Sequence, residues 1–301
     1  MTPDLMKAGA QIRVEHDRRV ATHSGGGGGR ETSYGRILQP GQLDVTHGAI
    51  LYLDDITVSF DGFKALNALS LSISAGELRC IIGPNGAGKT TIFNLISRIY
   101  NVTDGKLMFD GQDFTTMPAH RIAGLGIART FQNIELFANA SVLQNLLIGR
   151  HTHAQASLLA QLCFLPSTRR AEIGHREKVE DVIDFLELQR YRDTLIANLP
   201  YGVRKIVELG RALCTEPKIL LLDEPSSGLN AEETEVMGFW IEDIQKDLGI
   251  TVIMVEHDMS LVTAVATRVM ALNYGKVLAM GTPAEVQRDP EVIRAYLGGD
   301  P

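Results

Sequence analysis

The chain has 301 residues, with 29 Lys and Arg against 36 Asp and Glu, and so carries a formal net charge of −7. This acidic balance argues against a protein whose main task is to coat nucleic-acid phosphates, and no nucleic-acid partner is expected. Hydrophobic residues make up 45% and charged residues 22% of the chain, which is ordinary globular usage and excludes collagen-like and wholly disordered classes.

The sequence pattern predicts neither a membrane span nor an export signal. The longest apolar runs, such as Ile219–Leu222, are far shorter than the ~20 residues that a membrane-spanning helix needs. The N-terminal segment carries charges throughout and has no apolar core of the signal-peptide type. We therefore expect a chain that stays in the cytosol. Cys80, Cys163 and Cys214 are odd in number and widely spaced, which favours reduced, buried thiols.

Residues 1–49 differ in character from the rest of the chain. They contain the glycine run Gly25–Gly29 and scattered charges, without a sustained apolar period. Such a segment buries too little apolar surface to offset the entropy lost on ordering, so we expect a flexible N-terminal extension. The folded domain is expected over residues 50–301.

Strand patterns begin at Ile50. The alternating stretch Ile50–Phe60 predicts a strand, a second strand is expected at Leu69–Ile73, and a third, largely apolar one at Glu77–Ile82. The third strand leads directly into the glycine-rich segment Gly83–Thr90, which is followed by a helix.

A mostly helical insert is expected over about residues 133–203. Apolar residues recur at helical spacing in Val142–Leu147 and in Val179–Leu186, and the loop-like segment Leu165–Arg170 lies between them.

The last third of the chain returns to strands. Lys218–Asp223 and Ile250–Val255 are short apolar runs bounded by polar residues, which is typical of buried parallel strands. Val269–Ala279, with a turn at Asn273–Lys276, predicts a hairpin.

Gly83–Thr90 fits the pattern G-x-x-x-x-G-K-[ST]. In this motif the glycines let backbone N–H groups converge on phosphate oxygens, and the following helix adds the positive end of its dipole. Lys89 would reach the outer phosphates and Thr90 would bind Mg²⁺. The preceding strand and the following helix give the context that a phosphate-binding loop requires.

Asp223 and Glu224 follow an apolar strand further along the chain. A carboxylate at a strand end beside a phosphate loop can hold Mg²⁺, and the next carboxylate can polarise an attacking water. We expect Asp223 in the first role and Glu224 in the second.

Four further features are informative because of their order. Gln132 stands where the helical insert begins, and His257 follows the strand after the Asp-Glu strand. Leu199–Val203 and Ser227–Asn230 flank the Asp-Glu pair. Each feature alone is a weak signal, but the order and spacing of all four turn a general nucleotide-binding prediction into a particular one.

In these motifs residues 50–301 resemble the ATP-binding subunit of ATP-binding cassette (ABC) transporters. By that resemblance Gly83–Thr90 is the Walker A loop, Ile219–Asp223 the Walker B strand, Leu199–Val203 the signature motif and Ser227–Asn230 the D-loop. The implied fold is an α/β P-loop NTPase core with a parallel sheet, an antiparallel β subdomain and an inserted helical subdomain.

The resemblance also implies roles for single residues. Glu224 would be the general base, His257 would position the γ-phosphate and the water, and Gln132 would link nucleotide state to a membrane partner. Phe60 matches the aromatic residue that stacks on adenine, although Phe63 could serve instead and Phe60 could be a core residue of its strand. The implied nucleotide contacts are Phe60, Gly83, Pro84, Asn85, Gly86, Ala87, Gly88, Lys89, Thr90, Thr91, Tyr201 and Gly202, and the implied Mg²⁺ ligands are Thr90, Gln132 and Asp223.

Narrower matches indicate the branched-chain amino acid importer branch. Thr130–Phe137 and Val142–Gly149 are similar to that branch's segments around the start of the helical insert. Gly281–Val286 and Asp289–Gly298 are similar to its C-terminus. These segments do not contact solute in the family, so they indicate lineage and not cargo.

The signature segment departs from the family's usual Leu-Ser-Gly-Gly-Gln. Pro200 stands where a serine hydroxyl contacts the γ-phosphate, and it has neither a hydroxyl nor an N–H; Val203 replaces the glutamine. Tyr201 and Gly202 can still offer backbone N–H groups at a helix start. The extension of residues 1–49 is also outside the family pattern.

The resemblance implies an ATP-binding and hydrolysing subunit that uses Mg²⁺ and powers an importer for branched-chain amino acids or related small solutes. In the implied head-to-tail dimer, ATP lies between one subunit's Lys89 loop and the other's Gly202 helix, and the second subunit is a copy of this chain or a related cassette. Separate transmembrane permease subunits would dock near Gln132–Leu147, and a periplasmic or extracellular solute-binding protein would act indirectly.

By the same resemblance the chain would lie at the cytoplasmic face of the cell membrane as a peripheral protein. Two alternatives stay open. One is a soluble ABC ATPase that is not tied to transport, and the other is a nucleotide-binding regulatory module that hydrolyses weakly because of Pro200.

Overall fold

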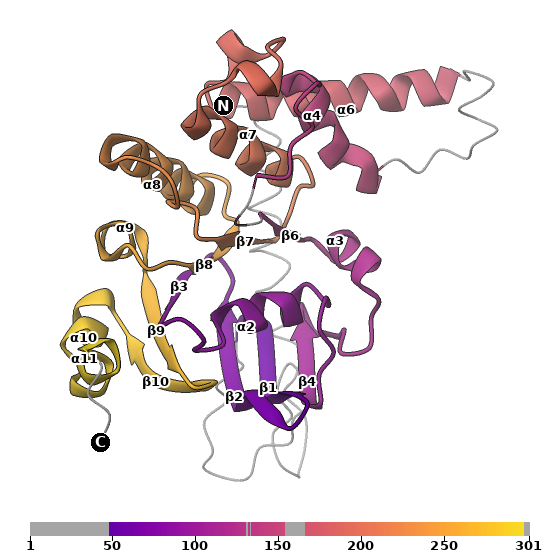
Figure 1. Cartoon of the computed structure of the whole chain (residues 1–301). Helices are drawn as coiled ribbons and strands as arrows, with labels where there is room; N and C mark the ends of the chain where they lie inside the picture. Colours follow the sequence, from indigo (N-terminus) through magenta and orange to yellow (C-terminus); the bar gives the residue numbers. More distant parts are fainter. Residues whose placement is uncertain (1–47, 131, 133, 154–165, 298–301) are drawn as a thin grey trace.

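The computed structural model describes residues 48–130, 132, 134–153 and 166–297. The expected extension, apart from its last two residues, lies outside the described residues, as does Cys163. Ala49 already opens the first strand, one residue before the predicted domain start. Figure 1 shows the strands in the lower and middle parts of the molecule and a group of helices at the top.

The described strands form two sheets. A four-stranded antiparallel sheet has the order β2-β1-β4-β5, and a six-stranded sheet has the order β10-β9-β3-β8-β7-β6. The strands are β1 (Ala49–Phe60), β2 (Phe63–Ser74), β3 (Leu78–Ile82), β4 (Asp104–Phe109), β5 (Gln112–Asp113), β6 (Ile127–Arg129), β7 (Ile219–Asp223), β8 (Thr251–Val255), β9 (Arg268–Asn273) and β10 (Lys276–Gly281).

The antiparallel sheet is built on the β1–β2 hairpin. Strand β2 is longer than predicted, because Asp61 and Gly62 both have positive φ and turn the chain tightly, so that Phe60 pairs with Phe63. An Asp-Gly turn of this kind matches the twist of the two strands.

In the larger sheet β3 pairs in parallel with both β8 and β9, and β7 pairs in parallel with β6 and β8. Only the last pair, β9 with β10, is antiparallel, as the predicted hairpin requires. The central strands β3, β7 and β8 are buried at every residue, which explains their nearly continuous apolar runs.

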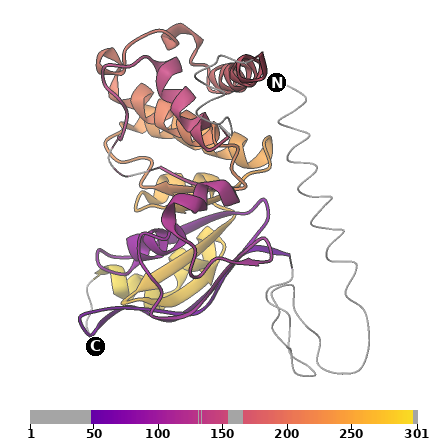
Figure 2. The same ribbon diagram turned by 90° about the vertical axis from the view of Figure 1, so that its right-hand side faces the viewer.

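Two apolar clusters lie on opposite faces of the parallel sheet. One face packs with α2 (Lys89–Ile96) and the antiparallel sheet, through residues such as Ile81, Phe93 and Leu221. The other face, with Cys80 and Leu220, packs with the helices between β6 and β7 and with those that follow β7. Figure 2 shows the antiparallel sheet and β9–β10 at the lower end and the helices above them.

The helical insert is present and includes one difference from its prediction. Helix α6 begins at Pro166, so that Pro166–Arg170, expected as a loop, is helical. Proline is well tolerated in the first turn of a helix, because its missing N–H has no intrahelical acceptor there. The α-helices are α2 (Lys89–Ile96), α3 (Ile122–Leu125), α4 (Val142–Gly149), α6 (Pro166–Phe185), α7 (Tyr201–Leu213), α8 (Ala231–Lys246), α9 (Met259–Val265), α10 (Pro283–Arg288) and α11 (Pro290–Leu297).

The parallel and antiparallel sheets with their inserted helices confirm the predicted α/β fold class. Short 3₁₀ turns complete the described chain at Ala119–Arg121, Arg150–His153, Gln189–Tyr191 and Ile196–Asn198. Within the described ranges, none of the helices is both long and apolar enough to cross a bilayer.

Candidate functional site

The glycine-rich loop joins β3 to α2, at the carboxyl edge of the parallel sheet. A Cβ at Gly83 would lie 2.2 Å from the carbonyl oxygen of Leu272, and one at Gly88 would lie 2.9 Å from that of Ala65, so neither position has room for a side chain. The β9–β10 turn also supports the loop, because the Gly275 N–H donates to the Ala87 carbonyl at 2.9 Å.

Lys89 folds back across this loop. Its Nζ donates to the carbonyl oxygens of Gly83, at 2.7 Å, and Pro84, at 3.1 Å. Burial lowers the pKa of Lys89, while the charges of Glu224 and Asp223 act in the opposite direction. The structure thus places this ammonium group within the field of both predicted carboxylates. Thr90 and Thr91 follow in the first turn of α2.

The predicted carboxylates stand at the end of β7. Asp223 is its last residue, 6% exposed, and Glu224 follows with a φ of 50°, a left-handed conformation that is uncommon for a residue other than glycine. Such outliers gather at functional sites. The Gln132 Nε2 donates to the Glu224 Oε2 at 2.8 Å, which joins two residues that the sequence analysis selected separately.

Arg129 is a site residue that the sequence analysis missed. It lies at the end of β6, and its guanidinium contacts the Asp223 Oδ2 at 2.7 Å and the Asn94 Oδ1 at 2.7 Å. It also lies over the ring of Phe93. Arg129 therefore fixes the end of β7 against α2. The only sequence signal was a basic residue in an otherwise apolar strand.

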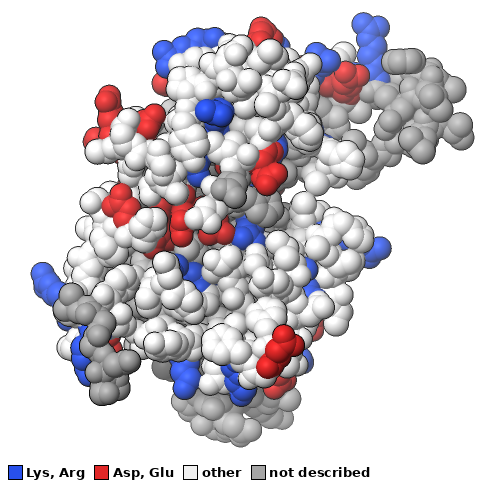
Figure 3. Space-filling view, viewed as in Figure 1, with Lys and Arg blue, Asp and Glu red and all other residues white. Residues whose placement is uncertain are grey.

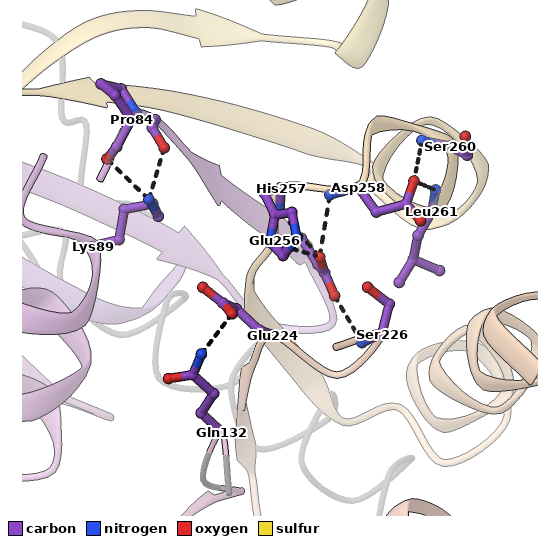
Figure 4. Close-up of polar contacts among 11 residues, drawn as sticks. Pro84, Lys89, Gln132, Glu224, Ser226, Glu256, His257, Asp258, Ser260 and Leu261 are labelled. Atoms are coloured by element: carbon purple, nitrogen blue, oxygen red, sulfur yellow. Dashed lines mark hydrogen bonds and ion pairs between the residues drawn. The ribbon is translucent and has the colours of Figure 1, made fainter. Parts of the chain in front are cut away.

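His257 lies beyond the end of β8, beside Glu256. The His257 side chain is 63% exposed, whereas that of Glu256 is fully buried. Figure 4 shows Lys89, Gln132, Glu224 and His257 around one space, where the carboxyl ends of β3, β7 and β8 meet. The structure brings together the residues expected to act on the γ-phosphate.

The predicted signature segment starts α7. Pro200 is the N-cap, and among the described residues no side chain hydrogen-bonds to this cap. Tyr201 and Gly202 form the first turn, as expected. A Cβ at Gly202 would lie 2.5 Å from the Glu233 Oε1, which shows that the Glu233 carboxylate lies against Gly202. The first turn of α7 therefore faces a carboxylate of its own chain.

Two basic side chains of α7 hold the segment that carries Gln132. Lys205 is 4% exposed, and its Nζ donates to the Gln132 carbonyl at 3.3 Å. Arg211 donates to the Glu135 carbonyl. Burial lowers the pKa of Lys205, and Glu208 leads the carboxylates that oppose this shift. Neither contact was predicted, since both partners are backbone carbonyls.

Phe60 ends β1 and is 42% exposed, so it is not a core residue of its strand. Its ring meets Tyr100 edge to face at 5.0 Å. Phe63 is 66% exposed at the start of β2. Both aromatic candidates therefore remain accessible to a base.

A groove of about 480 Å³ lies between the start of β6 and the helices α4 and α7. Its lining includes Ile122 and Arg129 on one side, and Ile148 of α4 with Glu208 and Arg211 of α7 on the other. Figure 3 shows acidic side chains gathered across the middle of one face, with basic side chains beside them.

Two family models match the chain. The model described as "ABC transporter" matches residues 66–227, and the model described as "Branched-chain amino acid ATP-binding cassette transporter" matches residues 276–301.

The chain is also similar to named proteins and solved structures. It is 38% identical over 249 residues to the high-affinity branched-chain amino acid transport ATP-binding protein BraF of Pseudomonas aeruginosa. The aligned segment covers 83% of this chain and 98% of that protein. It is 36% identical, with the same coverage, to LivG of Escherichia coli strain K12. A crystal structure of a nucleotide-free ATP-binding cassette from an ABC transporter matches with a TM-score of 0.73 and 31% identity, over 83% of this chain and 100% of that one.

Proposed function

The chain belongs to the ABC transporter family as an ATP-binding subunit with ATPase chemistry, and from this membership we propose that it powers the import of branched-chain amino acids. The observation that carries the site assignment is the convergence of Lys89, Glu224 and Gln132 at the carboxyl edge of one parallel sheet. Ligands of open α/β sheets bind at this edge.

We propose that the loop Gly83–Thr90 and the start of α2 bind the phosphates of ATP. The N-terminus of α2 supplies backbone N–H groups and a positive dipole end, and Lys89 supplies a full positive charge. Phe60 is proposed to stack on the adenine, since its ring is exposed at the end of β1.

Hydrolysis is assigned to Glu224, His257 and Gln132. Glu224 would accept a proton from the attacking water, which is general base catalysis. His257, with its exposed ring, would contact the γ-phosphate and the water. Gln132 already bonds to Glu224, so a shift of the segment that carries Gln132 would change how the base is held.

The residues at this edge fit a Mg²⁺ ion. Mg²⁺ takes oxygen ligands, and in nucleotide sites it is bound by one or two carboxylates together with phosphate oxygens. The Asp223 carboxylate, the Thr90 hydroxyl and the Gln132 amide offer such oxygens, and we propose them as its ligands. The bound ion would neutralise charge that develops on the transferred phosphoryl group.

The partners are part of the proposal. The first turn of α7 is proposed to contact the nucleotide of a second cassette, identical or related, because Tyr201 is 39% exposed at a helix start without a side-chain cap in the described chain. The groove beside Arg211 is proposed to receive a transmembrane permease subunit. A solute-binding protein would deliver solute to that permease, and the chain would lie at the cytoplasmic face of the membrane.

The choice of solute rests on the relatives and on the C-terminal match at residues 276–301. It is tested by purifying the chain with the permease subunits that accompany it and measuring uptake into proteoliposomes. Leucine, isoleucine and valine should enter in an ATP-dependent way, and Glu224→Gln should stop the uptake. Uptake of a different solute would contradict the branched-chain assignment while leaving the ATPase assignment intact.

A further inference from the structure

Glu256 is a buried carboxylate to which the proposed chemistry gives no role. It directly follows β8, between Val255 and His257, and it is 0% exposed. Burying a charged group in this way is costly unless hydrogen bonds replace the lost water. Its hydrogen bonds are therefore informative.

Three backbone N–H groups supply them. The Glu256 Oε1 accepts from the Ser226 N–H at 2.8 Å, and Oε2 accepts from the N–H groups of His257 at 3.0 Å and Asp258 at 3.3 Å. Figure 4 shows this carboxylate between the two loops. One loop follows Glu224, and the other carries His257.

The sheet itself does not hold these loops together. Its last contact between them is the Glu224 N–H, which donates to the Val255 carbonyl at 2.9 Å. Beyond that contact the two segments leave the sheet, and the Glu256 carboxylate bridges them. Hydrogen bonds to a charged acceptor are about twice as strong as neutral ones.

We propose that Glu256 is a positioning residue that fixes the spacing between the base Glu224 and His257. It acts through the backbone of both loops, its Oε2 also lies 3.9 Å from the His257 Nδ1, and it does not touch the substrate. The inference rests on the proposed roles of Glu224 and His257. It adds that one side chain sets the position of these two groups relative to each other. Because three N–H groups donate to this side chain, both of its oxygens must accept hydrogen bonds.

Glu256→Gln tests this proposal because it keeps the shape of the side chain. An amide has only one acceptor oxygen, so its NH₂ group would face a backbone N–H donor. Misplacement by about 1 Å can cost about a hundredfold in rate, so we expect the kcat for ATP to fall by at least about tenfold. The KM and the affinity for ATP should stay within about threefold of wild type, since the phosphate loop is unchanged.

Orthovanadate trapping gives a second readout, which needs a single hydrolysis event and does not depend on the steady-state rate. Wild type should retain ADP with vanadate in the site, whereas Glu256→Gln should bind ATP normally and trap much less ADP. The matched control is Thr251→Val, at the other end of β8, where the buried Thr251 Oγ1 accepts from the Gly76 N–H at 2.9 Å. This control should lower the melting temperature and leave kcat and trapping unchanged.

Equal kcat and equal trapping in Glu256→Gln and wild type would overturn the proposal, as would a parallel loss of ATP binding and trapping. If Glu256→Gln does not fold, Glu256→Asp takes its place in the same measurements, because it keeps the charge but withdraws the carboxylate by one methylene. A wild-type chain that neither hydrolyses nor traps would instead contradict the proposed function.

Discussion

The Nε2 of Gln132 donates to the Oε2 of Glu224 across 2.8 Å. Gln132 stands between β6 and α4, and Glu224 follows β7, so the bond connects the start of the helical insert with the carboxyl edge of the sheet. The oxygen that would accept a proton from water is engaged by an amide from the segment that α7 holds through Lys205. The insert and the proposed base are therefore mechanically connected.

Glu224→Gln should keep ATP binding and nearly abolish turnover. An amide can hold a water but cannot accept its proton, and general base catalysis contributes about 10²–10⁴-fold. Phosphate release and the binding of a fluorescent ATP analogue measure the two effects separately. The exposed Glu235→Gln on α8 is the control and should behave as wild type. Near-normal phosphate release from Glu224→Gln would show that another group is the base.

Arg129→Gln should strongly destabilise the chain in the absence of nucleotide. The side chains of Arg129 and Asp223 are each 8% exposed, and loss of one partner of a buried pair typically costs about 3–5 kcal/mol. Urea unfolding measures the change.

The exposed pair Arg176–Glu172 gives the comparison, with side chains 54% and 62% exposed. Arg176→Gln should cost at most about 1 kcal/mol. A loss for Arg129→Gln no larger than this would mean that the buried pair does not hold the end of β7.

Pro200→Ser should fold and hydrolyse ATP at a rate equal to or above that of wild type. Serine is a preferred N-cap and should add about 0.5–2 kcal/mol to the stability of α7. It would also supply the hydroxyl that the proposed dimer lacks toward the γ-phosphate, where a hydrogen bond to a charged group is worth about 1.5–3 kcal/mol. Steady-state ATPase and thermal melting test both effects. A folded but inactive Pro200→Ser would contradict the placement of this segment at the nucleotide.

Gly202→Ala should lower stability, although alanine is normally favoured in a helix. Its Cβ would lie 2.5 Å from the Glu233 Oε1, so the Glu233 carboxylate, whose Oε2 accepts from the Asn230 N–H at the start of α8, would have to shift. Loss of a helix cap costs about 1 kcal/mol.

The matched control for this change is Gly174→Ala in α6, where a Cβ meets nothing within 4 Å. It should gain about 0.5–1 kcal/mol. Thermal melting that ranks Gly202→Ala at or above Gly174→Ala would show that Glu233 does not constrain the α7 terminus.

The described cysteines should resist alkylation in the folded protein. Burial raises the pKa of Cys214 to about 12, and burial, with a smaller contribution from Glu256, raises that of Cys80. At pH 8 the thiolate fraction of Cys214 is then about one in ten thousand, and the thiolate is the reactive form. In a Cys163→Ser background, mass spectrometry should find both thiols unmodified by iodoacetamide until urea is added. Modification of either thiol in the native protein would contradict this burial.

The sequence allows the site motifs to be proposed, but not the residues that support them. The glycine loop and the carboxylate pair stand in contiguous patterns whose chemistry can be read from residue types, whereas Gln132 was selected by its order and spacing among the motifs. Arg129 and Glu256 could not be assigned in the same way, since the partners of Arg129 lie on other strands and helices and those of Glu256 are backbone N–H groups.

The fold was predicted in outline, and the errors have local causes. The apolar runs predict the central strands β3, β7 and β8, whereas β4, β5 and β6 are not predicted because they are short or lack a sustained apolar run. The start of β2 differs from the prediction because the chain turns tightly at Asp61 and Gly62. Pro166 was interpreted as part of a loop, although the first turn of a helix accepts proline equally well.

The support that the β9–β10 turn gives to the phosphate loop has a consequence for synthesis of the chain on the ribosome. The Gly275 N–H bonds to Ala87, and the Leu272 carbonyl fills the space beside Gly83, so the loop depends on residues nearly two hundred positions downstream. Contacts this distant in sequence form late, and translation proceeds from the N-terminus at about 5–20 residues per second. The nascent chain therefore carries the complete phosphate-loop motif for many seconds before it can build the loop, and it becomes able to bind nucleotide only when its C-terminal hairpin has left the ribosome.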